Sequence, residues 1–131
     1  MKTKSFCLFQ EKPKIVPLYD EEVYFGEVEE ITSRDEGAER INVAKITLWS
    51  PDVIHYHKKG EETYICLEGE GKIFLNGQIF DFAPGVRVLI KPGTLHAARP
   101  KTDIEKLIFL CISSPAFNPK DVYKSPLGRA W

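Results

Sequence analysis

Glycine and proline recur so often along this chain that long helices have little room to form. The sequence contains nine of each, and the stretches between them rarely exceed about a dozen residues. Segments of this length suit β-strands, which run for about four to eight residues, better than helices, which need about ten or more. The spacing of these two residue types therefore predicts an all-β fold.

The segments between these breaks have the composition of strands. They are rich in β-branched and aromatic side chains, which pack well on a pleated surface. We expect strands within residues 21–31, 40–49, 63–82, 86–91 and 107–113. Residues 63–82 predict three short strands, and Asn76-Gly77 marks a hairpin, because a type I′ turn needs positive φ at both positions. These segments predict roughly eight short strands or more separated by turns, a pattern typical of a β-sandwich or barrel.

Two parts of the C-terminal third depart from this simple pattern. Residues 102–105 spell a helix capping box, and apolar residues recur at helical spacing from Ile104 to Cys111. The run from Leu107 to Ile112 is apolar on every face, however, so we favour a buried strand there over a helix. From Ser114 onward three prolines interrupt the chain, which predicts an irregular tail.

The charge balance argues against large charged partners. Eighteen basic and 19 acidic side chains give a net charge of −1, so nothing attracts the chain in bulk to nucleic acid or to an anionic membrane.

No apolar run approaches the roughly 18 residues that cross a bilayer, and residues 1–14 hold too short an apolar patch for a secretory signal. Cys7, Cys66 and Cys111 lack CxxC spacing and are typical of free thiols in a reducing compartment. We expect one cytoplasmic domain over residues 1–131.

Candidate chemistry concentrates in "IHYHKKGEETYICLEGEGK", residues 54–72. His55 and His57 stand two apart, and side chains two apart in a strand point to the same face. Imidazole nitrogens placed in this way can bind a common metal ion. The third histidine, His96, follows a tight Pro92-Gly93 turn. All three histidines are thus expected at strand starts next to turns, as if they converge at the mouth of a barrel.

These residues resemble the first of two sequence motifs of the cupins, a family of small β-barrel metalloproteins. The motif runs G-x5-H-x-H-x3,4-E-x6-G, and His55, His57 and Gly69 match it. Six residues between the motif carboxylate and Gly69 select Glu62 rather than Glu61. Glu61 is expected to be a solvated turn residue.

The second cupin motif, G-x5-P-x-G-x2-H-x3-N, is matched by Gly85, Gly93 and His96. Three motif positions differ in this chain, and none of them is a ligand position: Trp49, Lys91 and Pro100. The two motifs together, at the right separation, are much more specific than H-x-H alone.

The resemblance implies a fold and a metal site. The fold would be a cupin-type double-stranded β-helix, or jelly-roll barrel, with a core at about residues 45–112, an N-terminal strand extension and an irregular C-terminal tail. His55, His57, Glu62 and His96 would ligate one divalent transition metal ion. Imidazole and carboxylate discriminate poorly among Fe, Mn, Ni, Zn and Cu, so the identity of the ion stays open. The alternative is a degenerate cupin without metal.

Alternation along the strands selects the side chains next to these ligands. Tyr64 and Cys66 share the face of Glu62 and are expected to line the cavity, although Cys66 can equally well fill the core. Arg87 is a further candidate for the cavity lining. Its alternative is a solvated charge on the outer face of the sheet.

By the resemblance, the chain is expected to be a metal-dependent enzyme acting on a small polar molecule. The reaction types are those of dioxygenases, decarboxylases, and sugar-phosphate isomerases or epimerases; an open metal position can polarise a substrate oxygen or activate water or dioxygen. The alternative is a non-catalytic module that binds or senses a small ligand at the same site. The family also implies a homodimer, and an exposed sheet edge favours pairing. Residues 14–25, "KIVPLYDEEVYF", are the expected contact.

Overall fold

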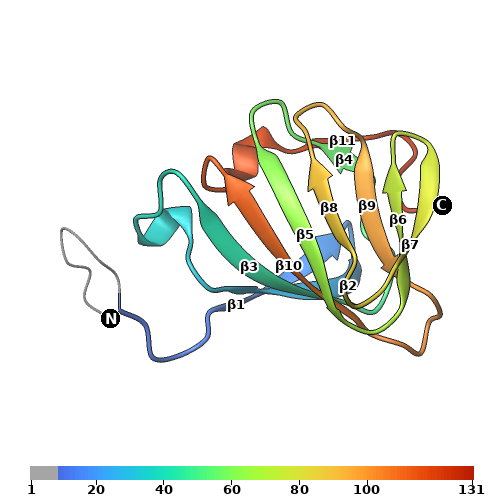
Figure 1. Ribbon diagram of the computed structural model, residues 1–131, viewed down its shortest axis with the longest axis horizontal. Coiled ribbons are helices and arrows are strands. Elements are labelled where there is room, and N and C mark those ends of the chain that lie inside the picture. The colour runs from blue at the N-terminus through green and yellow to red at the C-terminus, as the bar shows by residue number, and fades with distance from the viewer. Residues whose placement is uncertain (1–8) are drawn as a thin grey trace.

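Two antiparallel β-sheets face each other across a hydrophobic core in the computed structural model, which describes residues 9–131. The larger sheet has the strand order β1-β2-β3-β10-β5-β8. Its strands are β1 (Ile15–Asp20), β2 (Val23–Glu30), β3 (Asn42–Leu48), β10 (Leu107–Ser114), β5 (Glu61–Glu68) and β8 (Arg87–Ile90). Figure 1 shows the strands of both sheets arranged as a barrel.

The smaller sheet has the strand order β11-β4-β9-β6-β7. Its strands are β11 (Tyr123–Lys124), β4 (His55–Tyr56), β9 (His96–Pro100), β6 (Gly71–Leu75) and β7 (Gln78–Phe82). Two 3₁₀ helices lie in the connections: η1 (Arg34–Glu36) between β2 and β3, and η2 (Pro119–Asp121) just before β11. The all-β class and the barrel expected from the sequence are both confirmed.

The alternation of apolar and polar residues along the strands accounts for the core. On β10 every second residue from Leu107 to Ser113 is buried, and Phe109 is only 1% exposed. On the opposite sheet Ile73 and Phe82 are 1% and 0% exposed and belong to the same cluster. The apolar run of residues 107–112 therefore forms a strand, as favoured above, because it is covered by neighbours on both edges.

The β6–β7 hairpin confirms the turn expected from Asn76-Gly77. The two residues have φ values of 48° and 90°, the positive pair that a type I′ turn requires. Leu75 and Gln78 pair directly across the turn. A Cβ added at Gly77 would meet no atom within 4 Å, so the glycine is needed for its backbone conformation rather than for space.

The C-terminal segment covers the outer face of the smaller sheet. Trp131 packs against Phe74, with ring centroids 5.7 Å apart, and Figure 1 places the end of the chain beside β6 and β7. Arg129 donates hydrogen bonds to the Pro51 carbonyl and to Ser50 Oγ, both at 2.7 Å. The tail is irregular apart from η2 and β11, and β11 extends the smaller sheet by pairing with β4.

Three expectations from the sequence concern the chain's ends and its thiols. Cys7 and most of the apolar patch weighed as a secretory signal lie in residues 1–8, outside the described residues. Cys66 and Cys111 are buried free thiols. Over residues 9–131 the structure contains no helix long and apolar enough to cross a bilayer.

Candidate metal centre

Side chains from both sheets meet inside the barrel at the four positions selected by the sequence motifs. His55 opens β4 and pairs directly with His96, which opens β9. His57 follows β4, and Glu62 reaches across from β5. One ligand atom from each residue lies within 4.8 Å of those of the other three. Bonds of about 2.1 Å would hold such atoms about 3.0–4.2 Å apart, so the most distant pair would have to approach by at most about 0.6–1.8 Å to close around one ion.

Each of the three imidazole rings is oriented by a backbone carbonyl. The Nδ1 atoms of His55, His57 and His96 lie 2.6, 2.7 and 2.8 Å from carbonyl oxygens. A carbonyl oxygen only accepts, so each Nδ1 carries the proton and donates. The three carbonyls belong to Val53, Asp121 and Thr94. Whenever one of these rings is neutral, its free lone pair is therefore on Nε2, the arrangement found in metal-binding histidines.

Glu62 faces the histidines with one carboxylate oxygen. Its Oε1 lies 2.9 Å from His57 Nε2 and 3.0 Å from His96 Nε2. Two imidazole lone pairs facing a carboxylate oxygen would repel it, so this contact requires positive charge between the groups, either protons on the rings or a metal ion. The donor set present here fits a divalent transition metal.

The ionisation states agree with this geometry. Burial raises the pKa of Glu62, but hydrogen bonds from His57 and His96 lower it more, so the pKa lies well below its usual value. Burial lowers the pKa of His57, but the hydrogen bond and charge of Glu62 outweigh it and leave the pKa raised. Burial and the charge of His96 lower the pKa of His55 to about 3, which keeps that ring neutral. Glu62 and His55 thus have the ionised and neutral forms that bind metal, whereas a metal ion would have to displace the proton that Glu62 favours on His57.

The second oxygen of Glu62 is held by strand β10, which sequence reasoning did not connect to the site. Ser113 pairs with Glu62 in the register of β10 and β5, and its hydroxyl donates to Oε2 at 3.2 Å. The Cys111 thiol donates to the same oxygen at 3.2 Å. Burial and the nearby Glu62 charge raise the pKa of Cys111 well above its usual value, so the thiol stays protonated. The alternation of residues 107–113 was the one signal for these two side chains.

Asp121 in η2 fixes the loop that joins His57 to Glu62, and no local sequence pattern indicates this contact. Its carboxylate accepts hydrogen bonds from the backbone N–H groups of Lys58, Lys59 and Gly60 at 2.9, 3.1 and 3.0 Å. Burial raises the pKa of Asp121, but these three bonds lower it more, so the pKa lies below its usual value. The backbone carbonyl of the same residue orients His57. One residue of the tail thus supports both the loop and a candidate ligand.

Tyr64, Cys66 and Arg87, the expected cavity-lining residues, have different surroundings. Tyr64 is 3% exposed, with its ring centroid 5.9 Å from that of His96, and its hydroxyl makes no hydrogen bond within residues 9–131. Cys66 is packed in the hydrophobic core, with its sulfur 4.0 Å from two backbone carbonyl oxygens. Arg87 is exposed on the outer face of β8, because Val88 and Ile90 turn inward. It therefore does not line the cavity.

A cavity of about 300 Å³ ends at the centre. His57 and Glu62 form part of its wall, together with residues 59–60 of the loop after β4 and the segment 115–118. The ring of Phe117 stands edge-on to that of His57, with centroids 6.0 Å apart. The candidate centre can therefore be approached from this side of the barrel.

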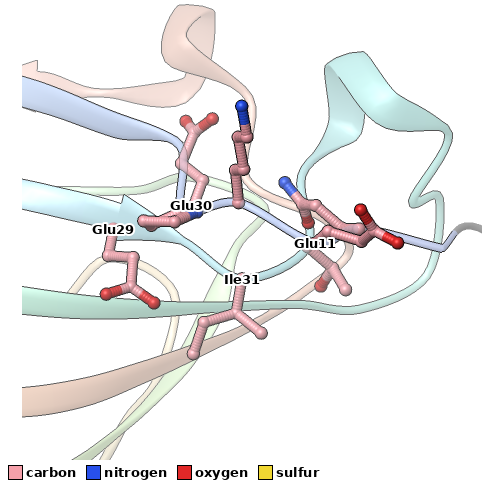
Figure 2. A pocket seen from close by; sticks show the side chains of 8 residues that line it. Glu11, Glu29, Glu30 and Ile31 are labelled. Carbon is pink, nitrogen blue, oxygen red and sulfur yellow. The ribbon is translucent and has the colours of Figure 1, made fainter. Parts of the chain in front are cut away.

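A second hollow, of about 500 Å³, lies between residues 10–13 and the end of β2. Figure 2 shows the side chains of Glu11, Glu29, Glu30 and Ile31 around it. Glu30 pairs with Lys14 at 2.9 Å, and Glu29 pairs with Lys45 at 3.8 Å. None of the four candidate ligands lines this hollow, and its charges are those of an ordinary solvated surface.

Comparison with known proteins places the central part of this chain in a family. Residues 49–113 match the family model described as a cupin domain. An uncharacterized protein of Aquifex aeolicus is 27% identical over 107 residues, which cover 72% of this chain and 87% of that protein. An uncharacterized protein of Methanocaldococcus jannaschii is 31% identical over 78 residues, covering 60% of this chain and 62% of its relative.

Solved structures show the same architecture. Oxalate decarboxylase of Bacillus subtilis superposes with a TM-score of 0.64 and 18% identity, over 76% of this chain and 28% of its own. Pac13, a nucleoside dehydratase of Streptomyces, superposes with a TM-score of 0.68 and 13% identity. The superposition covers 89% of this chain and 92% of Pac13. A Klebsiella pneumoniae protein with a double-stranded β-helix domain superposes with a TM-score of 0.61 and 20% identity. This superposition covers 70% of this chain and 78% of that protein. With its two facing antiparallel sheets, the chain is a small cupin domain protein with the double-stranded β-helix fold.

Proposed function

We propose that this protein is a metal-dependent cupin enzyme that acts on a small polar molecule. One divalent transition metal ion would be held by His55, His57, Glu62 and His96. The observation that carries this proposal is the common orientation of the three imidazoles. Every ring donates Nδ1–H to a backbone carbonyl, and one ligand atom of each ring lies within 4.8 Å of a ligand atom of Glu62, an arrangement that a packing role for three histidines would not require.

The surrounding residues define what each group does at such a site. When bound, the ion supplies a Lewis acid that polarises a substrate oxygen. Glu62 offsets one of its two positive charges and is held in place by hydrogen bonds from Ser113 and Cys111. Tyr64 offers a neutral hydroxyl next to the centre, since burial and the charge of Glu62 raise its pKa well above the usual value. A buried phenol without a protein partner is available to a substrate oxygen.

Substitution of the four residues tests the ligand set. His55→Ala, His57→Ala and His96→Ala should each sharply reduce the metal content of folded protein. Glu62→Gln should reduce it less, because an amide oxygen still coordinates but no longer offsets the charge of the ion.

The matched control for this series is the neighbouring carboxylate. Glu61 is paired with Lys91 at 3.3 Å on the surface, so Glu61→Gln should leave metal content unchanged. Metal that survives two of the histidine substitutions, or that depends on Glu61 instead of Glu62, would overturn the assignment. Mass spectrometry of metals in the purified variants, with circular dichroism to establish folding, measures both quantities.

A turnover screen separates an enzyme from a non-catalytic binding module. The screen uses small organic acids and sugar phosphates with the metal-loaded protein. Turnover that disappears with a chelator and returns with one metal supports the enzyme. Saturable ligand binding without turnover across the panel supports the module and would contradict the catalytic part of the proposal.

A further inference from the structure

The cavity that ends at the metal centre carries positive charge without a protein partner. Arg34 from η1 and Lys59 from the loop after β4 both line it. Within the described chain, residues 9–131, neither side chain forms a salt bridge or a hydrogen bond with another residue. The neighbouring Lys58 differs, because its ammonium group lies over the ring of Tyr123 at 4.3 Å.

The acidic groups of the same cavity are already occupied. Glu62 receives hydrogen bonds from two histidines, a thiol and a hydroxyl. The Asp121 carboxylate receives three backbone N–H groups. Neither carboxylate forms a direct ion pair with Arg34 or Lys59, so the two charges of each sign on the wall balance only in sum, and a bound metal ion would make the wall positive overall. The cavity is suited to an anion.

Part of the remaining wall is apolar and suits the carbon part of a ligand. Pro115, Ala116 and Phe117 form this part, and the ring of Phe117 stands edge-on to that of His57. A volume of about 300 Å³ corresponds to about ten water molecules at about 30 Å³ each. This is room for a small organic molecule, and an apolar wall would contribute nothing to the binding of an inorganic ion.

We propose that the substrate is a small organic acid, held in this cavity with a carboxylate against Arg34 and Lys59 and its other end at the metal centre. This assignment rests on the proposed function and adds a substrate class to it. A guanidinium group can pair with a carboxylate through two parallel hydrogen bonds, which fixes orientation as well as charge. A carboxylate held in this way would place the opposite end of a short molecule next to Glu62 and His57, which line the same cavity.

Isothermal titration calorimetry with succinate and its neutral analogue succinamide tests the charge requirement. The full chain is used both loaded with zinc and metal-free. Succinate should bind at least about tenfold more tightly than succinamide, since hydrogen bonds to charged groups are stronger than neutral ones. Arg34→Gln and Lys59→Gln should each weaken succinate binding about tenfold or more without changing zinc content. Lys106→Gln, an exposed cation in the distant turn before β10, is the matched control and should change nothing.

The outcomes separate this proposal from the proposed function. Absence of zinc binding would overturn the metal assignment, while the dependence of succinate binding on Arg34 and Lys59 is still measured in the metal-free protein. Equal affinity for succinate and succinamide, or unchanged affinity in both glutamine variants, would overturn the acid-binding cavity even if zinc binds. Inorganic phosphate that binds as tightly as succinate would overturn the assignment to an organic acid.

Discussion

Removal of the Asp121 carboxylate should weaken metal binding although the residue contributes no ligand atom. In Asp121→Asn the amide keeps one oxygen acceptor, which can serve one or two of the backbone N–H groups of residues 58–60. Its NH₂ group would face a remaining N–H donor and repel it. At least one of the three hydrogen bonds is lost, and the others lose their ionised acceptor.

The size of the effect follows from these bonds. A hydrogen bond to a charged group contributes about 1.5–3 kcal/mol when it is sheltered, and the partial exposure of the loop favours the lower end. The substitution removes about 2 kcal/mol of the free energy that keeps the loop ordered. If this loss appears in metal binding, the metal dissociation constant rises about 30-fold. This lies within the 10- to 100-fold range typical of groups that orient metal ligands.

Competition between the protein and a metal-binding dye measures the dissociation constant directly. Asp103→Asn, in the exposed turn before β10, removes a carboxylate without touching the loop and should behave like the unmodified chain. Thermal unfolding of the metal-free variants provides the second measurement. If Asp121→Asn lowers the melting temperature of the metal-free protein but leaves the dissociation constant within twofold, the carboxylate only stabilises the fold and the reasoning is refuted.

Four further predictions concern the turn, the pH dependence, the phenol and the assembly. Gly77→Val, at φ 90°, should lower the free energy of unfolding by about 1–2 kcal/mol with metal content per folded molecule unchanged in mass spectrometry; metal loss would link the turn to the site. Because the pKa of His57 is raised above 6.5, protons already compete for its Nε2 near neutral pH, so dye competition should show weaker metal binding as the pH falls through this region; a flat profile between pH 8 and about 6 would argue against His57 as a ligand. Tyr64→Phe should keep the metal but lower turnover in the substrate screen, and full activity would remove the phenol from the reaction. Edge strand β1 exposes Ile15 and Tyr19, so sedimentation at micromolar concentration should give twice the mass of one chain, whereas a single-chain mass contradicts the dimer.

The elements that depend on local sequence were predictable. The Asn76-Gly77 turn and the inward face of β5 follow from φ preferences and from alternation, and both rules act over a few residues. The convergence of His55, His57 and His96 with Glu62 required the family motifs in addition, because alternation alone does not say which strands become neighbours.

The supporting contacts of the site were not predictable in the same way. Asp121 is more than 60 residues away in sequence from the loop it holds, and an aspartate next to a proline-containing turn has no local feature that reveals such a contact. Ser113 reaches Glu62 only through the register of β10 on β5, which is set by the whole sheet. The side of the sheet on which Arg87 lies was left open between the cavity and the outer face for a related reason, since alternation identifies two faces but does not say which one is inside.

The position of β10 has a consequence for how this protein is made. It lies between β3 and β5 in the larger sheet, yet a ribosome synthesises both of those strands well before it. Until residue 107 emerges, the nascent chain carries two unpaired strand edges, which are templates for pairing with other chains. The hydrogen bonds that hold Glu62 also arrive with this strand. Closure of the barrel and completion of the centre are therefore late, simultaneous events in biosynthesis, and a message truncated before residue 107 encodes a chain prone to aggregation rather than a smaller working barrel.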